Sequence, residues 1–302
     1  MEPMNEFLIK EEQVFSGGLS CRGCGWALLV RHLSSILGEK TVYVLPASCF
    51  SIITGPYPLN ELKGTIVHTM FAAAPATATG IRAVLDRQGN EDATVAVLAG
   101  DGGTFDIGIQ SLSGAASRGE NILYVCNNNG AYMNTGIQTS TATPYGAITT
   151  TNPGANFKNT MPKDLMGIIA AHNIPYAATA SLAFLEDYRN KIKKAKETKG
   201  FRLLMIDGPC PPGHKTSPDQ SISITRLAVE TNLFPLFEVE NQKYKINYFP
   251  EKRVPVEKCM KLQGRFSHLF KNNSANVIQE IQDYTDHNWQ RLNELHKQSS
   301  SN

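Results

Sequence analysis

The stretch TVAVLAGDGG, at residues 94–103, is decisive for the fold. Its first five residues are almost wholly apolar and show no alternation with polar ones, which is typical of a central parallel strand buried on both faces. A similar run, ILYVCN, follows at residues 122–127. By this criterion we predict strands at Thr41–Leu45, Thr94–Leu98, Ile122–Cys126 and Arg202–Ile206.

Segments with the apolar spacing of helices separate these strands. We predict helices at Trp26–Gly38, Ala72–Gln88, Ile107–Arg118, Asp164–His172 and Leu182–Thr198. Strands that alternate with helices indicate an α/β fold, here a doubly wound and mostly parallel sheet.

Three further segments complete the organisation of the chain. Thr135–Met161 has no helical or strand period, and a loop of this length in a compact domain usually has a function or contacts a partner chain. Pro209–Gln220 is also expected to be irregular, whereas Val254–Ser300 has a polar, helical pattern. We therefore predict one domain over residues 1–253 and a helical C-terminal arm over 254–302, which packs on the domain or on a partner.

Composition excludes several classes of protein. The 302 residues are 41% hydrophobic and 19% charged, which argues against disorder. The net charge is only +2 and the basic residues are scattered, so nucleic acid is not an expected partner. No apolar stretch near the N-terminus resembles a signal peptide, and the most apolar segment, Met70–Ile81, is too short to cross a bilayer. We expect a soluble, cytoplasmic protein.

Six cysteines are too sparse for a disulfide scaffold. Cys21 and Cys24 form a C-x2-C pair, which is typical of metal binding or of redox chemistry. The spacing of this pair alone does not decide between the two.

A second motif joins two strand ends. Asp101 follows the strand at 94–98, and Asn129 lies 28 residues later, at the end of the next predicted strand. Ligands of open parallel sheets bind at the carboxyl ends of the strands, so we expect both residues at one crevice. Carboxylate and amide oxygens suit Mg²⁺, and Gly102 and Gly103 allow the backbone to approach a diphosphate. By itself GDG is weak evidence, because an aspartate that caps a helix after an ordinary turn gives the same letters.

Together the two motifs resemble the thiamin diphosphate motif, in which GDG is followed after about thirty residues by NN. Longer elements resemble the beta subunit of pyruvate:ferredoxin oxidoreductase and its 2-oxoacid relatives: GDGGTFDIG at 100–108, AYMNTGIQTS at 131–140 and TP at 143–144. The likeness covers most of the chain, from the cysteine pair through to Pro255 and the QGRF element at 263–266.

The resemblance implies roles for individual residues. Asp101 and Asn129 would bind magnesium through their side chains and Ala131 through its carbonyl, while Asn134 would be the catalytic residue that faces the thiazolium carbon. The remaining residues of the implied cofactor-binding set are Gly102, Gly103, Gly25 and His68. For His68, as for His214, an ordinary structural role is an equal alternative.

The resemblance also implies that Cys21, Cys24, Cys49 and Cys210 hold one [4Fe-4S] cluster. The alternative is a structural zinc site with four cysteines. Such sites normally supply a second closely spaced pair, whereas Cys49 and Cys210 stand alone, which favours the cluster. Cys126 and Cys259 are expected to be ordinary buried thiols.

The implied function is oxidative decarboxylation of a 2-oxoacid. Pyruvate is the first expectation, oxalate and other 2-oxoacids remain open, and electrons would pass through the cluster to ferredoxin. Thiamin enzymes also need a glutamate on a pyrimidine domain, and this chain has only one predicted sheet. We therefore expect an alpha-type subunit that supplies that domain, at or near the loop Thr135–Met161.

Further expectations from the resemblance are a subunit or domain that carries ferredoxin-like clusters, a dimer of heteromers, and an anaerobic cytoplasm. Many relatives carry an acidic residue where this chain has Gly130, so the 2-oxoacid and the use of coenzyme A stay open. Two other hypotheses are a non-redox thiamin decarboxylase half-subunit and a zinc-stabilised assembly protein.

Overall fold

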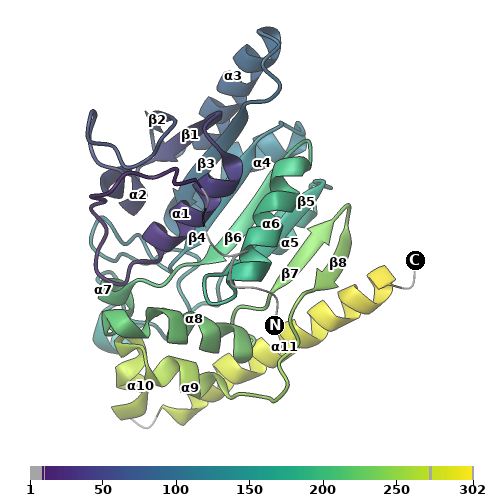
Figure 1. Cartoon of the computed structure of the whole chain (residues 1–302). Coiled ribbons are helices and arrows are strands. Elements are labelled where there is room, and N and C mark those ends of the chain that lie inside the picture. Colours follow the sequence, from purple (N-terminus) through teal and green to yellow (C-terminus); the bar gives the residue numbers. More distant parts are fainter. Residues whose placement is uncertain (1–8, 10, 272–273, 301–302) are drawn as a thin grey trace.

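The computed structural model describes residues 9, 11–271 and 274–300. Within them, eight strands form one sheet in the order β2-β1-β3-β4-β6-β5-β7-β8 (Figure 1). The first six positions of this order are parallel, and β7 and β8 are antiparallel additions at one edge. The strands are β1 (Thr41–Pro46), β2 (Thr65–Thr69), β3 (Thr94–Gly100), β4 (Leu123–Asn128), β5 (Tyr176–Ser181), β6 (Arg202–Asp207), β7 (Phe237–Glu240) and β8 (Lys243–Ile246).

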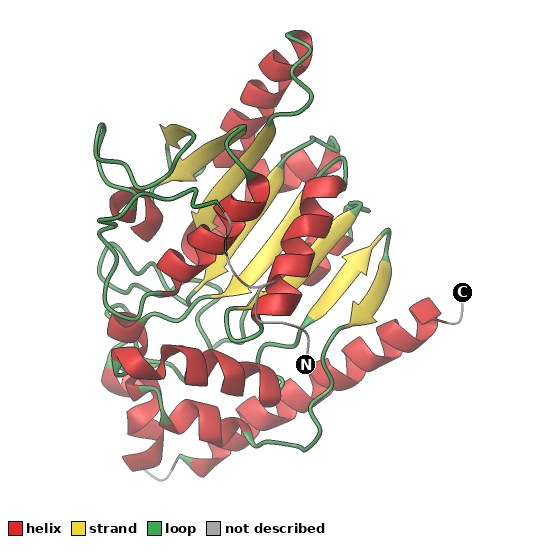
Figure 2. Ribbon diagram, in the orientation of Figure 1, coloured by secondary structure: helices red, strands yellow, loops and turns green. Residues whose placement is uncertain are grey.

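Helices cover both faces of the sheet (Figure 2). The helices are α1 (Gly25–Leu37), α2 (Cys49–Ile53), α3 (Ala74–Arg87), α4 (Ile109–Ser117), α5 (Leu165–Ala170), α6 (Leu185–Glu197), α7 (Pro211–His214), α8 (Ser221–Glu230), α9 (Val256–Lys261), α10 (Ser267–Lys271) and α11 (Ala275–Ser300). One core cluster joins the sheet to α1 and α6, and the other joins it to α3, α4 and α5.

Strand β3 shows why its sequence lacks a polar face. Ala96 and Leu98 lie in the cluster with α1 and α6, whereas Val97 and Ala99 lie in the cluster with α3 to α5. Successive side chains of a strand point to opposite faces, and here both faces are buried. The doubly wound α/β fold predicted from this pattern is confirmed.

All four predicted strands are present, as β1, β3, β4 and β6, but four others were missed. β5 has the sequence YAATAS, and although it is wholly buried its alanines have low strand propensity. β2 is a half-exposed edge strand, and β7 and β8 are only four residues each. The segment Pro209–Gln220 was wrongly expected to be irregular throughout, since it contains α7 and a 3-10 turn, η4, at Pro218–Gln220.

The helical arm consists of α9, α10 and α11, and it contacts both the long loop and the edge of the sheet. Apolar side chains of the arm pack on Ala147 and Tyr145 of the loop. At its other end α11 lies along β8, where Ser299 Oγ accepts the Tyr244 amide at 2.8 Å and His296 Nδ1 lies 3.2 Å from the Tyr244 carbonyl oxygen. Among the described residues, no helix combines the length and the hydropathy needed to span a bilayer.

Candidate active site at the carboxyl end of the sheet

Two neighbouring strands deliver the predicted magnesium ligands to one edge of the sheet. β3 pairs with β4 in parallel, with Gly100 opposite Asn127, so both chains leave the sheet at the same level. Asp101 follows β3 directly and leads into a π-helical turn, η2 (Gly102–Asp106), whereas Asn129 follows β4. The structure therefore brings together two residues that lie 28 positions apart in the sequence.

Three oxygen atoms converge at this point. The side-chain oxygen of Asn129 lies 2.8 Å from Asp101 Oδ1 and 3.0 Å from the carbonyl oxygen of Ala131. Three acceptors facing one another are unfavourable unless a cation lies among them or the amide is turned so that its nitrogen donates to both. In octahedral Mg²⁺ sites, metal–oxygen distances of about 2.1 Å place adjacent ligands about 2.9 Å apart. Both distances from the Asn129 side chain therefore fit neighbouring positions around such an ion.

Asp101 is fully buried but is held by donors. Ser140 Oγ donates to its Oδ2 at 2.5 Å, and the Asn129 backbone N–H donates to its Oδ1 at 3.4 Å. Burial nevertheless raises the pKa of Asp101 to about 7. A nearby cation would favour the ionised carboxylate, which is the form that binds metal.

The glycines after Asp101 keep side chains out of the diphosphate position. A Cβ on Gly102 would collide with the ring of Tyr132, and one on Gly103 would lie 3.2 Å from the ring of Phe71. Tyr132 is itself fixed, because its hydroxyl donates to Asp106 Oδ2 at 3.2 Å. The backbone of η2 can therefore approach a ligand more closely than a chain with side chains here would allow.

The carbonyl of Asn129 has two buried partners: His214, for which the sequence left a place in the site open beside a structural role, and Arg265, which sequence reasoning missed. His214 Nε2 lies 2.8 Å from this oxygen, and Arg265 Nη1 donates to it at 3.4 Å. Burial lowers the pKa of His214, which favours the neutral ring, and lowers that of Arg265 to about 10. The QGRF element was part of the resemblance, but no sequence signal assigned Arg265 to this contact.

A crevice of about 210 Å³ opens beside these groups. It is lined by Trp26, by Cys49 and Ile52 of α2, by Phe71, and by the segment 131–135, which includes Asn134. Gly102, Gly103 and Asn129 form its floor. Asn134 is exposed, as a residue that awaits a substrate or a partner would be. The two other residues of the implied cofactor-binding set do not line this crevice: Gly25 begins α1, and His68 is exposed on β2.

Gly25 instead joins the cysteine pair to the segment before Cys210. Its amide donates to the Pro209 carbonyl at 3.1 Å, and a Cβ at this position would lie 2.6 Å from Pro209 Cδ. Trp26, the next residue, stacks on Phe50 of α2 with ring centroids 4.6 Å apart. These contacts bring the beginnings of α1, α2 and α7 together, and each of these helices begins at or just after a cysteine.

The four predicted cluster ligands lie near one another. Burial, followed by the charges of Cys210 and Cys21, raises the pKa of Cys24 to about 11 despite backbone hydrogen bonds. Burial and the other three thiols raise that of Cys49 to about 12. Within the described part of the chain, no three His, Cys, Asp or Glu side chains are close enough to share a single metal ion.

The remaining two cysteines lie elsewhere, and both are buried. Cys126 lies within β4 and Cys259 within α9, and burial raises the pKa of each, that of Cys259 to about 12. Neither contributes to the charges that shift Cys24 or Cys49. Their environment is that of ordinary buried thiols.

Comparisons with known proteins show what this chain is similar to. Residues 47–206 match the family model for the thiamine pyrophosphate enzyme C-terminal TPP binding domain. The chain is 44% identical to ketoisovalerate oxidoreductase subunit VorB of Pyrococcus horikoshii over 94% of each chain. It is 43% identical to pyruvate synthase subunit PorB of Methanothermobacter thermautotrophicus, over 94% of this chain and 98% of that one.

One solved structure shares the fold. It is the 2-oxoglutarate:ferredoxin oxidoreductase of Magnetococcus marinus, with a TM-score of 0.59 and 23% identity. The match covers 74% of this chain and 82% of that chain. At this level of identity the likeness is one of architecture.

Proposed function

The chain belongs to the family of 2-oxoacid:ferredoxin oxidoreductase beta subunits, and we propose that it is the half of such an enzyme that binds magnesium and the diphosphate of thiamin diphosphate. It is thus a subunit of an oxidoreductase that acts on 2-oxoacids. Pyruvate is the substrate we propose to test first. Relatives named for pyruvate and for ketoisovalerate are equally similar, so their names do not separate the two substrates.

The observation that carries this proposal is the convergence of the Asp101, Asn129 and Ala131 oxygens. Bound thiamin diphosphate supplies a carbon nucleophile for the 2-oxo carbon and a sink for the electron pair that remains when carbon dioxide leaves. The chain's own part is to anchor the diphosphate through these oxygens and the η2 backbone. Asn134, on the crevice wall, would contact the substrate.

The four thiols support a route for those electrons. Cys49 lines the crevice, so one of the proposed cluster ligands lies on the same wall as Asn134. The charges of the other three thiols each act on Cys49, so the four cysteines lie in one region, as the ligands of a cubane must. Two electrons could then leave one at a time through a cluster at this position.

The open side of the crevice supports a partner subunit. Ile52 lines the crevice and is 55% exposed, and Tyr57, on the loop after α2, is 92% exposed. Met70 precedes the crevice residue Phe71 and is 77% exposed. Apolar side chains around a site mark a contact surface. We propose that the alpha-type subunit binds here and brings the pyrimidine domain with its glutamate.

The test is anaerobic purification of the chain with its partner subunits. Iron, sulfide, zinc, magnesium and thiamin are quantified, and reduction of a one-electron acceptor is measured. The substrates are pyruvate, 3-methyl-2-oxobutanoate, 2-oxoglutarate and oxalate, each with and without coenzyme A. We expect about four iron and four sulfide per chain, bound thiamin and magnesium, and activity that depends on a 2-oxoacid.

Three outcomes contradict parts of the proposal. A colourless preparation that holds thiamin and decarboxylates without reducing the acceptor indicates a non-redox decarboxylase half-subunit. Zinc in place of iron and thiamin indicates an assembly protein. Full turnover by this chain alone contradicts the need for an alpha-type subunit.

A further inference from the structure

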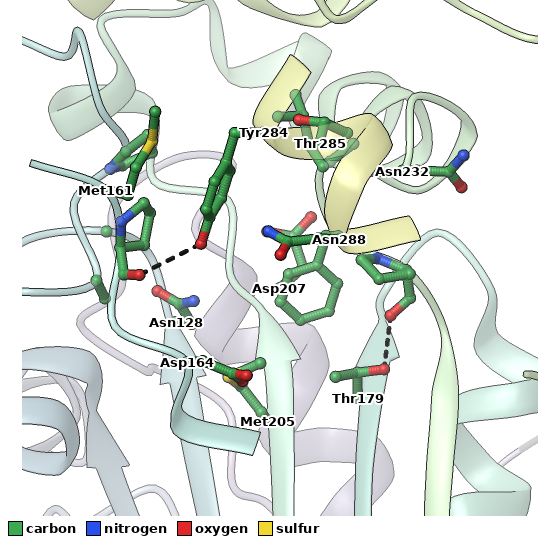
Figure 3. Close-up of a pocket in the computed structure, with 18 of the residues that line it drawn as sticks. Asn128, Met161, Asp164, Thr179, Met205, Asp207, Asn232, Tyr284, Thr285 and Asn288 are labelled. Atoms are coloured by element: carbon green, nitrogen blue, oxygen red, sulfur yellow. Dashed lines mark hydrogen bonds between the residues drawn. The ribbon is translucent and has the colours of Figure 1, made fainter. Parts of the chain in front are cut away.

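A second cavity, which we call the inner cavity, lies at the same edge of the sheet. It has a volume of about 480 Å³, within the range typical of small-molecule sites. It lies between the ends of β4, β5 and β6 on one side and α8, α9 and α11 on the other (Figure 3). Among the described residues, Asn129 alone lines both this cavity and the crevice.

Asp207, the last residue of β6, points into the inner cavity (Figure 3). Its side chain makes no hydrogen bond or ion pair with any described residue, and its Oδ2 is buried. Asn128, opposite it in the β4–β6 register, and Asn288 of α11 also point into this space, and their amides have no hydrogen-bond partner in the described part of the chain. Buried polar groups in native proteins are nearly always paired, so the buried and unpaired Oδ2 of Asp207 indicates a missing ligand.

Arg265 lies in the wall of the same cavity. Its Nε donates to Gln263 and its Nη1 to the Asn129 carbonyl, while Nη2 makes no hydrogen bond to a described residue. Asp207 and Arg265 shift each other's pKa, yet they are not within the 4.0 Å of an ion pair. They are opposite charges that face one cavity across a gap.

The other charged side chains of the lining are already paired. Arg291 binds Asp164 at 2.6 Å, and Lys163 lies 3.6 Å from Asp106. The rest of the wall is largely apolar and includes Phe105, Met166, Met205, Phe234 and Phe237. A ligand for this cavity therefore needs one group for the carboxyl, one for the guanidinium and an apolar body.

We propose that the inner cavity binds a zwitterionic α-amino acid with an apolar side chain, its ammonium group on Asp207 and its carboxylate on Arg265. An acid without an ammonium group would leave Asp207 unpaired and would be repelled by it, and an amine without a carboxylate would do the same to Arg265. A zwitterion pairs with both without adding net charge. The site goes beyond the proposed function, because its ligand differs from the one proposed for the thiamin crevice, although Asn129 lines both cavities.

The experiment is isothermal titration calorimetry on the full chain, purified with its partner subunits. L-Leucine is compared with 4-methylpentanoate, which lacks its amino group, and with 3-methylbutylamine, which lacks its carboxylate. We expect saturable binding of leucine and about 10- to 100-fold weaker binding of each half-ligand, the usual effect of losing a charged hydrogen bond. Valine and phenylalanine extend the series.

Two variants test the assignment to the inner cavity. Asp207→Asn should weaken leucine binding at least tenfold and leave 4-methylpentanoate binding unchanged or tighter. Ala228→Phe, from the cavity wall, removes volume without changing charge and should abolish binding. Asp92→Asn, whose side chain is 82% exposed, is the matched control. If Ala228→Phe lowers the melting temperature too far for titration, Asp207→Asn alone decides.

Failure to bind any of the amino acids at millimolar concentration contradicts the proposal. So does equal binding of leucine and its two half-ligands, and so does full leucine affinity in the Ala228→Phe protein. None of these results contradicts the proposed function, because cofactor content and 2-oxoacid oxidation are measured independently on the same preparation.

Discussion

Asp101 and Asp207 both lie at the carboxyl ends of strands of the same sheet, but their side chains have different surroundings. Burial raises the pKa of both Asp101 and Asp207 to about 7. Asp101 is oriented by Ser140 and the Asn129 amide, and it faces two further oxygens, whereas Asp207 has no described partner. An equal pKa therefore does not mean an equal role. These surroundings are the basis for our proposals that the carboxylate in the crevice binds a metal and the one in the inner cavity binds an organic cation.

The largest effect is expected from Asp101→Asn. Loss of a direct metal ligand should cost more than the roughly 10- to 100-fold that follows from removing groups behind a ligand. We expect thiamin and magnesium to be absent from the purified complex and 2-oxoacid oxidation to fall more than about 100-fold. Asp92→Asn should behave as wild type in the same assay. If the Asp101 variant retained stoichiometric magnesium, Asp101 would not be a metal ligand, and the two aspartates would not differ in this respect.

The next effect concerns the cluster that we propose beside the crevice. Cys210→Ala should lose the cluster, because its thiol belongs to the set that shifts Cys49, while thiamin and magnesium content stay close to wild type. Iron content and visible absorbance measure the loss. Cys259→Ala, a buried thiol outside the set, is the control and should keep its iron. A fully loaded cluster in the Cys210 variant would show that this residue is not a ligand.

A smaller effect, on stability, is expected from Gly102→Ala, because the Tyr132 ring leaves no room for a Cβ at this position. Gly102→Ala places a methyl group against the Tyr132 ring and should destabilise the chain by about 1–3 kcal/mol, as overpacking usually does. Gly100→Ala has open space around its Cβ and should change the free energy of unfolding by no more than about 0.5 kcal/mol. Chemical denaturation of both variants measures the difference. Equal stabilities would mean that the Tyr132 ring moves aside without cost.

The smallest effect is a pH dependence that comes from Asp207. An acid whose pKa is higher in the folded chain than in the unfolded chain destabilises the fold as pH rises through that interval, here from about 4 to about 7. Without ligand, Asp207→Asn should remove this decline and make the chain more stable than wild type at pH 8, with little difference at pH 4. Unfolding curves at both pH values check it, and a stability gap that does not change with pH would contradict it.

The predictions from the sequence agree best with the structure where a pattern of neighbouring residues was sufficient to identify an element. Short apolar runs predicted β1, β3, β4 and β6, and the spacing from Asp101 to Asn129 predicted that the ends of β3 and β4 meet. The alanine-rich β5 was missed because alanine has a low strand propensity, although the strand is wholly buried. The partners of the Asn129 carbonyl could not be predicted, because His214 and Arg265 lie 85 and 136 residues away.

The contact between α11 and β8 has a consequence for how copies of this chain meet. The outer strand of a sheet normally presents unpaired N–H and C=O groups that can recruit a strand from another molecule. On β8 the N–H of Tyr244 is bound by Ser299, and its C=O lies within hydrogen-bond distance of His296, so α11 takes up both groups. The helix thereby blocks strand addition at this edge. Growth of the sheet from one chain to the next, the first step of edge-to-edge aggregation, is prevented there by the chain's own C-terminal helix.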